Sequence, residues 1–322
     1  MESPQSTMNA IWLEGGTAEL RTNTPSPTIE PGWALVKVRL VGICGTDRQL
    51  MTGYAGFCGI PGHEFVGEVV AGSESWLGKR VVADINVGCG ACAACGISAH
   101  HCEARRVLGI RRLHGALAEF LTLPETNLVA VPEEVGDAAA ALAEPLAAAL
   151  HVIDDAPPDA TGATVFGDGA LGHLVARALQ SHDFQVSMVG RHAEKLRFAE
   201  THGIATTTNV HEIQREPLVV DCTGTPTGLR TALDHLSPGG TLILKSTHAP
   251  GVKCDLSGLV VDECRIVGSR CGDLQTAVEA LTAGRVRVHD LTGEPRTLLQ
   301  AVDVLSNASR PTELKALIDP RS

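Results

Sequence analysis

The sequence predicts an α/β protein made of an irregular, β-rich domain followed by a doubly wound parallel sheet. Between residues 33 and 131, short β-rich runs such as WALVKVRLVGICG and EFVGEVVAG are separated by glycine and proline. This pattern is typical of short strands joined by turns. From about residue 160 the pattern becomes buried strand, glycine turn and helix, repeated along the chain. Such alternation predicts a parallel sheet with helices on both faces.

The remaining elements follow from local patterns. The alanine-rich run at 137–150 predicts a helix that is interrupted at Pro145, because proline lacks the backbone N–H that an internal helical turn uses. The last fifty or so residues contain two helix-like stretches and a final strand, LKALIDP, which we expect to return to the first domain. We therefore assign residues 1–150 and 275–322 to the first domain and residues 151–274 to the parallel sheet.

Length and composition narrow the function. A chain of 322 residues with 44% hydrophobic and 20% charged residues can form two globular domains. A formal net charge of −11 argues against nucleic acid as the main partner, because phosphate binding needs a basic surface. Apolar runs long enough for a membrane span and a secretion signal are both lacking. We expect a cytoplasmic protein, whose ten cysteines are metal ligands or buried thiols rather than disulfides.

The segment VFGDGALGH carries Gly167, Gly169 and Gly172 in the spacing G-x-G-x-x-G, after an apolar strand and before a helix. Such glycines allow a tight turn and let a pyrophosphate approach the backbone at a helix N-terminus. With Ala170 and Leu171 between them, they predict a Rossmann-type dinucleotide site in residues 151–274. The alternative is that they serve only the turn.

A cluster of four cysteines, Cys89, Cys92, Cys95 and Cys102, occupies one short loop. Four thiolates at this spacing can close a tetrahedral zinc site that leaves no position open for a substrate. The alternatives are free surface thiols, or a ligand set that uses His100 or His101 from the same loop.

A second candidate metal site combines Cys44 and His63 with an acid, either Glu64 or the distant Glu144. Sulfur, imidazole and carboxylate ligands suit zinc, and three protein ligands leave a coordination position open. Each residue also has a plain structural interpretation: a buried thiol, a histidine in a turn and charges on a surface.

Taken together, these motifs resemble a known family. GICGTD, GHEFVGEVV, the cysteine loop, ALAEFLTLP, AEPLAAAL, VFGDGALG and DCTGT occur in the order and spacing of medium-chain zinc-dependent dehydrogenases. The resemblance is to the branch that contains sorbitol, threonine and glucose dehydrogenases. It implies a GroES-like catalytic domain joined to a Rossmann domain, with a homodimer or homotetramer expected.

The resemblance also implies residue roles. Cys44 and His63 would bind a catalytic zinc, with Glu64 and Glu144 competing to complete its protein ligands, and the cysteine loop would hold a structural zinc. Thr46 matches the position whose hydroxyl passes the substrate proton onward. The expected reaction is hydride transfer between an alcohol or polyol (or an aldehyde or ketone) and NAD(P).

Three departures from the family pattern affect these expectations. Gln49 stands where some relatives have a histidine that continues the proton relay, and glutamine does not titrate. The last spacer of the cysteine loop has six residues, where seven is commoner in the family. The segment after Gly272 is short for the family.

Further coenzyme contacts are expected at the carboxyl ends of the later strands, where such sheets bind ligands. The candidates for contacts to the nicotinamide half are Thr223, Gly224, Lys245, Ser246, Thr247, Ser269 and Arg270.

The coenzyme is predicted to be NADP rather than NAD. The acid that would bind an unphosphorylated ribose at the end of the second strand is missing there, since the strand FQVSMV continues into Gly190, Arg191 and His192. Arg191 could bind a 2′-phosphate with a forked set of donors, assisted by His192 and Lys195. The alternative is that Arg191 is a solvated residue and NAD is used.

Two other functions remain as alternatives. One is a metal-free quinone or enone reductase of the same fold, which would need neither cysteine group. The other is a non-catalytic nucleotide-binding protein whose zinc is only structural. Metal content distinguishes all three functions.

Overall fold

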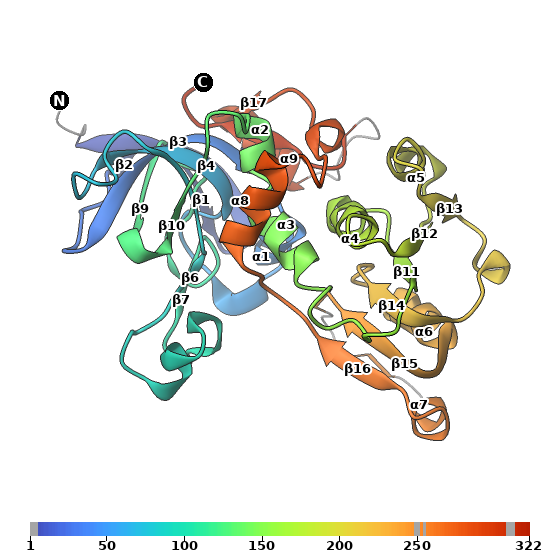
Figure 1. The fold of residues 1–322 in the computed structure, drawn as a ribbon. Coiled ribbons are helices and arrows are strands. Elements are labelled where there is room, and N and C mark those ends of the chain that lie inside the picture. Colours follow the sequence, from blue (N-terminus) through green and yellow to red (C-terminus); the bar gives the residue numbers. More distant parts are fainter. Residues whose placement is uncertain (1–5, 248–251, 254–255, 307–312) are drawn as a thin grey trace. The chain divides into compact units, whose positions relative to one another are not determined.

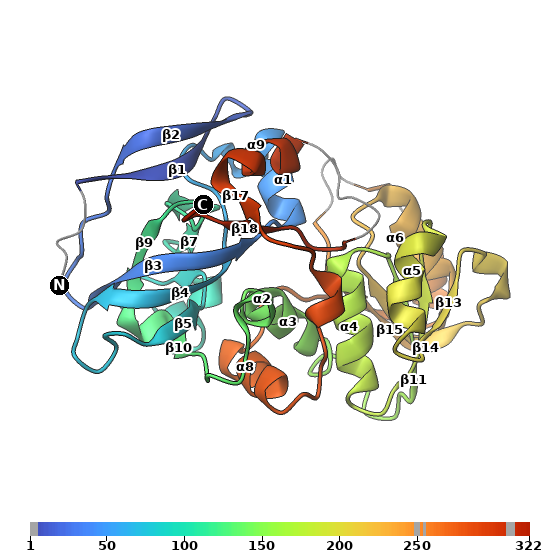
Figure 2. The same cartoon turned by 90° about the horizontal axis from the view of Figure 1, so that it is seen from above.

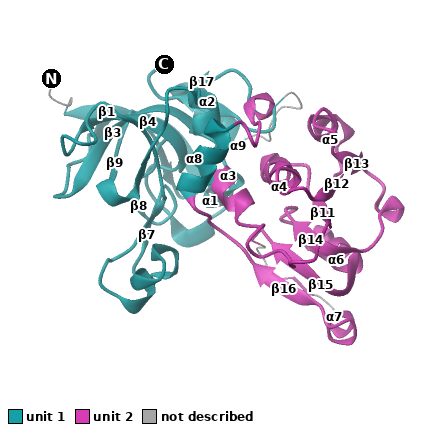
Figure 3. Ribbon diagram, in the orientation of Figure 1, with its two compact units in different colours: residues 1–144, 274–283, 292–322 teal, residues 145–273, 284–291 magenta. Residues whose placement is uncertain are grey.

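The computed structural model describes residues 6–247, 252–253, 256–306 and 313–322. These residues form two compact units (Figure 3). Unit 1 contains residues 1–144, 274–283 and 292–322, and unit 2 contains residues 145–273 and 284–291. The sequence assigned 145–150 and 284–291 to the first domain, whereas the structure groups both segments with unit 2, and Leu274 with unit 1. In segment 284–291, the Arg287 carbonyl and the Asp290 carboxylate accept hydrogen bonds from the buried Arg177.

Unit 1 is built mainly from β structure. Its largest sheet has the order β10-β5-β4-β3-β18-β17, with β9 also paired to β3. β1 and β2 form a separate pair, and β6, β7 and β8 form a small third sheet. The strands are β1 (Thr7–Glu14), β2 (Thr17–Pro25), β3 (Trp33–Gly42), β4 (Glu64–Ala71), β5 (Arg80–Ala83), β6 (Asn86–Val87), β7 (Arg106–Leu108), β8 (Arg112–Leu113), β9 (Phe120–Pro124), β10 (Leu128–Ala130), β17 (Arg296–Thr297) and β18 (Leu317–Asp319).

Short helices complete unit 1: α1 (Gly45–Met51), α2 (Asp137–Ala140), α8 (Leu274–Thr282) and α9 (Leu298–Ser306). Helix α9 packs on β1, β2 and α1 (Figure 2). Side chains such as Ile11, Val36, Leu117 and Leu298 form a shared apolar core, so the end of the chain is held in this unit. Within it, β18 pairs with β3, the strand that leads to Cys44.

Unit 2 contains one parallel sheet in the order β13-β12-β11-β14-β15-β16. This is the doubly wound order of dinucleotide-binding sheets, in which the chain reverses direction across the sheet beside its first strand. The elements are β11 (Gly162–Phe166), β12 (Gln185–Val189), β13 (Ala205–Thr207), β14 (Glu216–Asp221), β15 (Leu236–Leu244), β16 (Arg265–Gly268), α4 (Ala170–Gln180), α5 (Ala193–Glu200), α6 (Pro226–Asp234) and α7 (Ser257–Val261). Helix α4 packs on β11 and β12, and α6 packs on β14 and β15 (Figure 1).

The alanine-rich run differs from its prediction. It forms α2 and α3 (Ala143–Leu150), and the break falls at residues 141–142 instead of Pro145. Pro145 lies in the first turn of α3, where a backbone N–H has no helical partner to lose.

Among the described residues, no helix combines the length and the apolar character that crossing a bilayer requires.

We expect unit 2 to lose folding stability at low pH because of His173 in α4. Its side chain is fully buried with neither ring nitrogen hydrogen-bonded, and burial followed by the charge of Arg177 lowers its pKa to about 4. The unfolded chain binds this proton near pH 6.5, so stability is lost as the pH falls from about 6.5 to about 4. The loss amounts to about 3 kcal/mol.

We expect His173→Leu to reduce the loss of unfolding free energy between pH 7 and pH 4, as measured by urea unfolding of the whole protein. The exposed His211 provides the matched control, and His211→Gln should show the same pH dependence as wild type. An equally steep loss in His173→Leu would contradict the role of His173.

Candidate functional site

Three strands bring the candidate ligands together in unit 1. In the antiparallel pair β3–β4, Gly42 lies opposite Glu64, so Cys44, just after β3, comes close to His63, just before β4. In the pair β18–β3, Leu317 lies opposite the same Gly42. The register of one sheet therefore fixes the site.

Asp47, in the first turn of α1, connects these segments. Its carboxylate is fully buried and accepts hydrogen bonds from the backbone N–H groups of Cys44 (2.8 Å) and Gly62 (3.1 Å). The same carboxylate lies 3.3 Å from Nδ1 of His63. Burial raises the pKa of Asp47, but the neighbouring His63 and the two N–H donors outweigh it and hold the pKa below its usual range.

The contact with Asp47 orients the His63 ring. Burial alone would lower the pKa of His63, yet Asp47 raises it well above its ordinary value. Since Nδ1 faces the carboxylate, Nε2 is the nitrogen left for a ligand. A carboxylate behind a histidine in this way is the usual partner of a metal-binding imidazole.

Glu64 forms a buried ion pair with Lys315, whose Nζ lies 2.8 and 2.6 Å from the two carboxylate oxygens. A Cβ on Gly42 would come within 2.6 Å of Glu64 Oε2 and 3.3 Å of Lys315 Cδ, so the ion pair needs a glycine at position 42. Burial lowers the pKa of Lys315, but the Glu64 charge reverses this and raises it.

The possible ligand atoms of Cys44, His63 and Glu64 all lie within 4.8 Å of one another. Glu144 is outside this group, but it lies near enough for its pKa to be affected. Burial raises its pKa, Glu64 adds to this, and His63 and Lys315 act in the opposite direction. The hydroxyl of Thr46 lies 3.7 Å from Cys44 Sγ.

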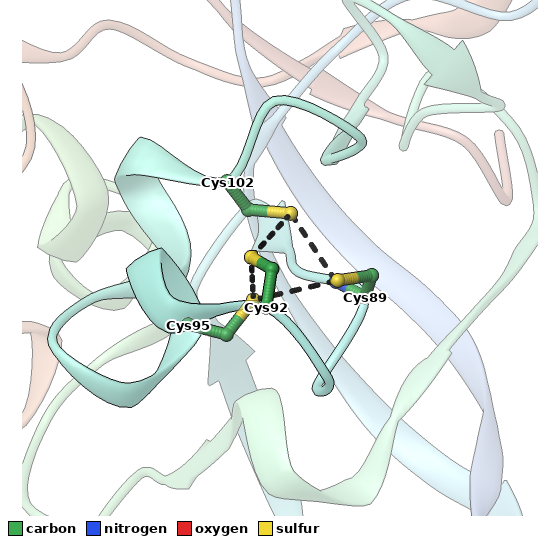
Figure 4. A group of neighbouring side chains, drawn as sticks. All are labelled: Cys89, Cys92, Cys95 and Cys102. Atoms are coloured by element: carbon green, nitrogen blue, oxygen red, sulfur yellow. Dashed lines mark hydrogen bonds between the residues drawn. The ribbon is translucent and has the colours of Figure 1, made fainter.

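The four cysteines of the loop also converge, with their sulfur atoms turned toward one another (Figure 4). Three of the Sγ–Sγ distances are 3.5, 3.8 and 3.9 Å. The sulfurs of a tetrahedral zinc site with Zn–S bonds of about 2.3 Å lie roughly 3.8 Å apart. These positions therefore fit a closed zinc site despite the six-residue spacer.

The surroundings of the loop favour thiolate at two of the four cysteines. The backbone N–H of Ala91 and further donors lower the pKa of Cys89 to about 6, and a hydrogen bond to the backbone of Gly90 helps to lower the pKa of Cys95. At Cys92 the backbone N–H of Cys95 acts in the same direction, but the neighbouring thiols outweigh it and raise the pKa to about 11. Neither alternative ligand is grouped with the four cysteines: His100 lies with Nε2 2.9 Å from the carboxylate of Asp84, and His101 is exposed.

In unit 2, the glycine motif lies between β11 and α4. Gly167 has φ +120°, and a Cβ there would come 2.7 Å from the carbonyl oxygen of Cys222. A Cβ on Gly172 would overlap the Gly167 carbonyl, whereas Gly169, the N-cap of α4, faces open space. This loop thus leaves the helix N-terminus accessible, as the approach of a pyrophosphate requires.

The residues expected near the nicotinamide follow β14, β15 and β16, in the segments 223–224, 245–247 and 269–270. The hydroxyl of Thr223 donates to the buried Asp221 at 2.6 Å. Lys245 Nζ donates to Ser269 Oγ (3.3 Å) and to the Arg270 carbonyl (2.8 Å), so it ties together the ends of two neighbouring strands.

At the end of β12, Arg191 is exposed. The backbone N–H groups of Arg191 and His192 donate to the carboxylate of Asp168, at 2.7 and 2.8 Å. Lys195 lies in the first turns of α5.

Three residues of these sites were not predicted from the sequence: Asp47, Lys315 and Asp168. Asp47 and Asp168 each lie inside a motif already identified, GICGTD and VFGDGALG, so an acid within a glycine-rich motif was the available signal.

Comparisons with known proteins agree with this geometry. Residues 30–133 match the family described as Alcohol dehydrogenase GroES-like domain, and residues 170–286 match Zinc-binding dehydrogenase. A glucose 1-dehydrogenase of Metallosphaera sedula is 30% identical over 89% of this chain and 91% of its own. This chain belongs to the zinc-type medium-chain dehydrogenase family.

Solved structures of this family show the same fold. A zinc-binding dehydrogenase of Sinorhizobium meliloti 1021, bound to NADP, matches with a TM-score of 0.90 and 28% identity over 98% of this chain and all (100%) of its own. An alcohol dehydrogenase of Escherichia coli CFT073, solved with NADH, matches with a TM-score of 0.89 and 25% identity over 98% of this chain and 100% of its own. The predicted fold class and family are confirmed, and the chain is an oxidoreductase that binds NAD(P).

The ion pair Glu64–Lys315 gives a stability prediction. Lys315→Met leaves the Glu64 carboxylate buried without its partner, which should lower the free energy of unfolding by about 3–5 kcal/mol. The double variant with Glu64→Gln removes the unpaired charge and should recover most of that loss. Urea unfolding measures both.

The exposed ion pair of Arg21 with Glu19 is the comparison, and Arg21→Met should cost well under about 1 kcal/mol. Equal losses in the two single variants would contradict the role of the buried pair.

Proposed function

We propose that this protein is a zinc-dependent dehydrogenase that transfers a hydride between an alcohol or polyol and a nicotinamide dinucleotide. The proposal is supported mainly by two distinct groups of possible zinc ligands in unit 1. One consists of four cysteines, and the other combines Cys44, His63 and Glu64. Metal-free reductases of this fold need neither group, and a purely structural zinc needs only the first. The glucose dehydrogenase relative supports a hydroxylated substrate.

In this proposal Cys44 and His63 hold the catalytic zinc, with Glu64 or Glu144 as the third protein ligand. A zinc ion bound there supplies Lewis acidity, which lowers the pKa of a hydroxyl oxygen. Glu64 belongs to the compact ligand group but shares both of its oxygens with Lys315. Glu144 is half-buried and is not part of that ion pair, so it is the acid that is free to bind the zinc or to move away from it.

Thr46 carries the substrate proton away from the site in this proposal. Its hydroxyl lies beside Cys44 Sγ, at 3.7 Å, and a hydroxyl can accept one proton while donating another. Gln49, one turn further along α1, does not titrate, so the proton reaches solvent by a route other than a histidine relay.

Unit 2 binds the dinucleotide in this proposal. Gly167, Gly169 and Gly172 shape the pyrophosphate loop, followed by Ala170 and Leu171 at the start of α4. A nicotinamide bound there would supply the hydride-transfer chemistry. Residues 223–224, 245–247 and 269–270, at the carboxyl ends of the strands, orient that half of the coenzyme.

We also propose a homodimer or homotetramer. Strand β16 lies at the end of the described sheet of unit 2. This strand contains Ile266, which is 42% exposed, and the preceding helix α7 contains Val260 and Val261, which are 77% and 80% exposed. An open strand edge with apolar side chains is typical of a surface that pairs with another chain.

Metal analysis tests the proposal. We expect about two zinc ions per chain, one for each ligand group. Cys44→Ser should lose one of them and all turnover while keeping the fold, because its zinc binds beside a preformed sheet. Cys92→Ser should lower the thermal midpoint instead, since structural zinc contributes folding free energy.

Cys58 is exposed and belongs to neither ligand group, so Cys58→Ser is the matched control. Turnover is screened with alcohols, polyols and sugars against NAD and NADP. Fewer than about one zinc ion per chain in freshly purified, active protein would contradict the proposal.

The proton relay has its own test. Thr46→Val keeps the shape of the side chain but removes the hydroxyl, and should lower kcat for alcohol oxidation by about 10²–10⁴-fold. Thr46→Ser should keep most of the activity. The hydroxyl of Thr52, at the end of the same helix, donates to the Gln49 carbonyl (2.8 Å), so Thr52→Val should be near normal. A near-normal kcat in Thr46→Val would refute the relay.

A further inference from the structure

Asp168 links the glycine loop of unit 2 to the end of the second strand. It lies between Gly167 and Gly169, and its Oδ2 accepts hydrogen bonds from the N–H groups of Arg191 (2.7 Å) and His192 (2.8 Å). Nδ1 of His192 lies 3.0 Å from the same oxygen. The carboxylate therefore lies over the turn that follows β12.

Gly190 shows how closely Asp168 approaches this turn. A Cβ on Gly190 would come 2.6 Å from Asp168 Cβ and 2.7 Å from its Oδ2. The backbone φ of Gly190 is not in the left-handed region, so this glycine is needed for space alone. The space beside position 190 is filled by the Asp168 carboxylate, which comes from another loop.

Asp168 also takes the donors that a phosphate would use. The N–H groups of residues 191 and 192 precede α5, and free N–H groups at a helix start are a ready anion site. Both are already bonded to Asp168 Oδ2. Burial raises the pKa of Asp168, but the N–H groups of His192 and Arg191 outweigh it and hold the pKa below its usual range, so the group is ionised at neutral pH.

We propose that Asp168 is the acid that recognises the coenzyme ribose in this chain, and that it selects NAD over NADP. The proposal rests on the proposed dinucleotide function of unit 2. In sheets of this kind the ribose-binding acid normally comes from the end of the second strand. Here that strand ends in Gly190, and the carboxylate reaches the same place from the first loop.

The two coenzymes differ in what they present to this carboxylate. Among the described residues, Asp168 Oδ1 accepts no hydrogen bond, so it can accept one from a ribose 2′-hydroxyl. A 2′-phosphate would meet a like charge and would compete for N–H groups already in use. Arg191 is exposed and remains able to stack on an adenine ring. This inference reverses the NADP preference predicted from the sequence.

The test is calorimetric titration of the whole protein with NADH and with NADPH, which reads binding and not turnover. The variants are Asp168→Asn, which keeps an oxygen for the two N–H groups but removes the charge, and Asp168→Ser. Asp183→Asn is the control, because Asp183 precedes the same strand at its opposite end and already has φ 64°, which asparagine tolerates.

We expect wild type to bind NADH at least about tenfold more tightly than NADPH, and Asp168→Asn to reduce this ratio by about tenfold or more. The ratio of the two dissociation constants is decisive, because a loosened loop would weaken the binding of NADH and of NADPH together. Asp183→Asn should keep the wild-type ratio.

A wild type that prefers NADPH overturns the inference even if neither Asp168 variant folds. An unchanged ratio in Asp168→Asn or Asp168→Ser also overturns it and leaves the proposed function standing. A wild type that binds neither coenzyme contradicts the dinucleotide function itself.

Discussion

The candidate site of unit 1 depends on one buried carboxylate. Asp47 accepts hydrogen bonds from the N–H groups of Cys44, itself a candidate ligand, and of Gly62, which precedes His63, and it faces the imidazole of His63. A buried charge is tolerated only when donors surround it. Folding of the loop after β3 and of the turn before β4 is therefore coupled to satisfying this one group.

The register of the sheet brings the second buried pair, Glu64 and Lys315, together. Because Gly42 lies opposite both Glu64 and Leu317, the acid and the cation of the second buried pair meet across three strands. Lys315 is separated from Glu64 by 251 positions in the chain. The end of the chain thus neutralises a charge that the beginning of β4 places in the interior. A carboxylate also links two segments in unit 2, where Asp168, in the loop after β11, accepts hydrogen bonds from the turn after β12.

The sequence was informative where a residue type has few structural uses. Glycines at fixed spacing after an apolar strand, and four cysteines in one loop, predicted the doubly wound sheet and the convergent thiols. Pro145 was misplaced because proline is excluded from helix interiors but not from a first turn. Lys315 could not have been found, since nothing local distinguishes a lysine that will be paired across a sheet from one at the surface. Asp168 stands within the glycine motif of the sequence, but its role could not be inferred without knowing that it lies against Gly190.

We infer that unit 1 holds a catalytic zinc in addition to a structural one. Diffraction data collected on both sides of the zinc absorption edge, from crystals of the whole protein, would locate both ions. Two anomalous peaks per chain are expected, one among the four loop cysteines and one bonded to Cys44 and His63. A peak only among the loop cysteines, in crystals of protein that oxidises alcohols, would contradict it.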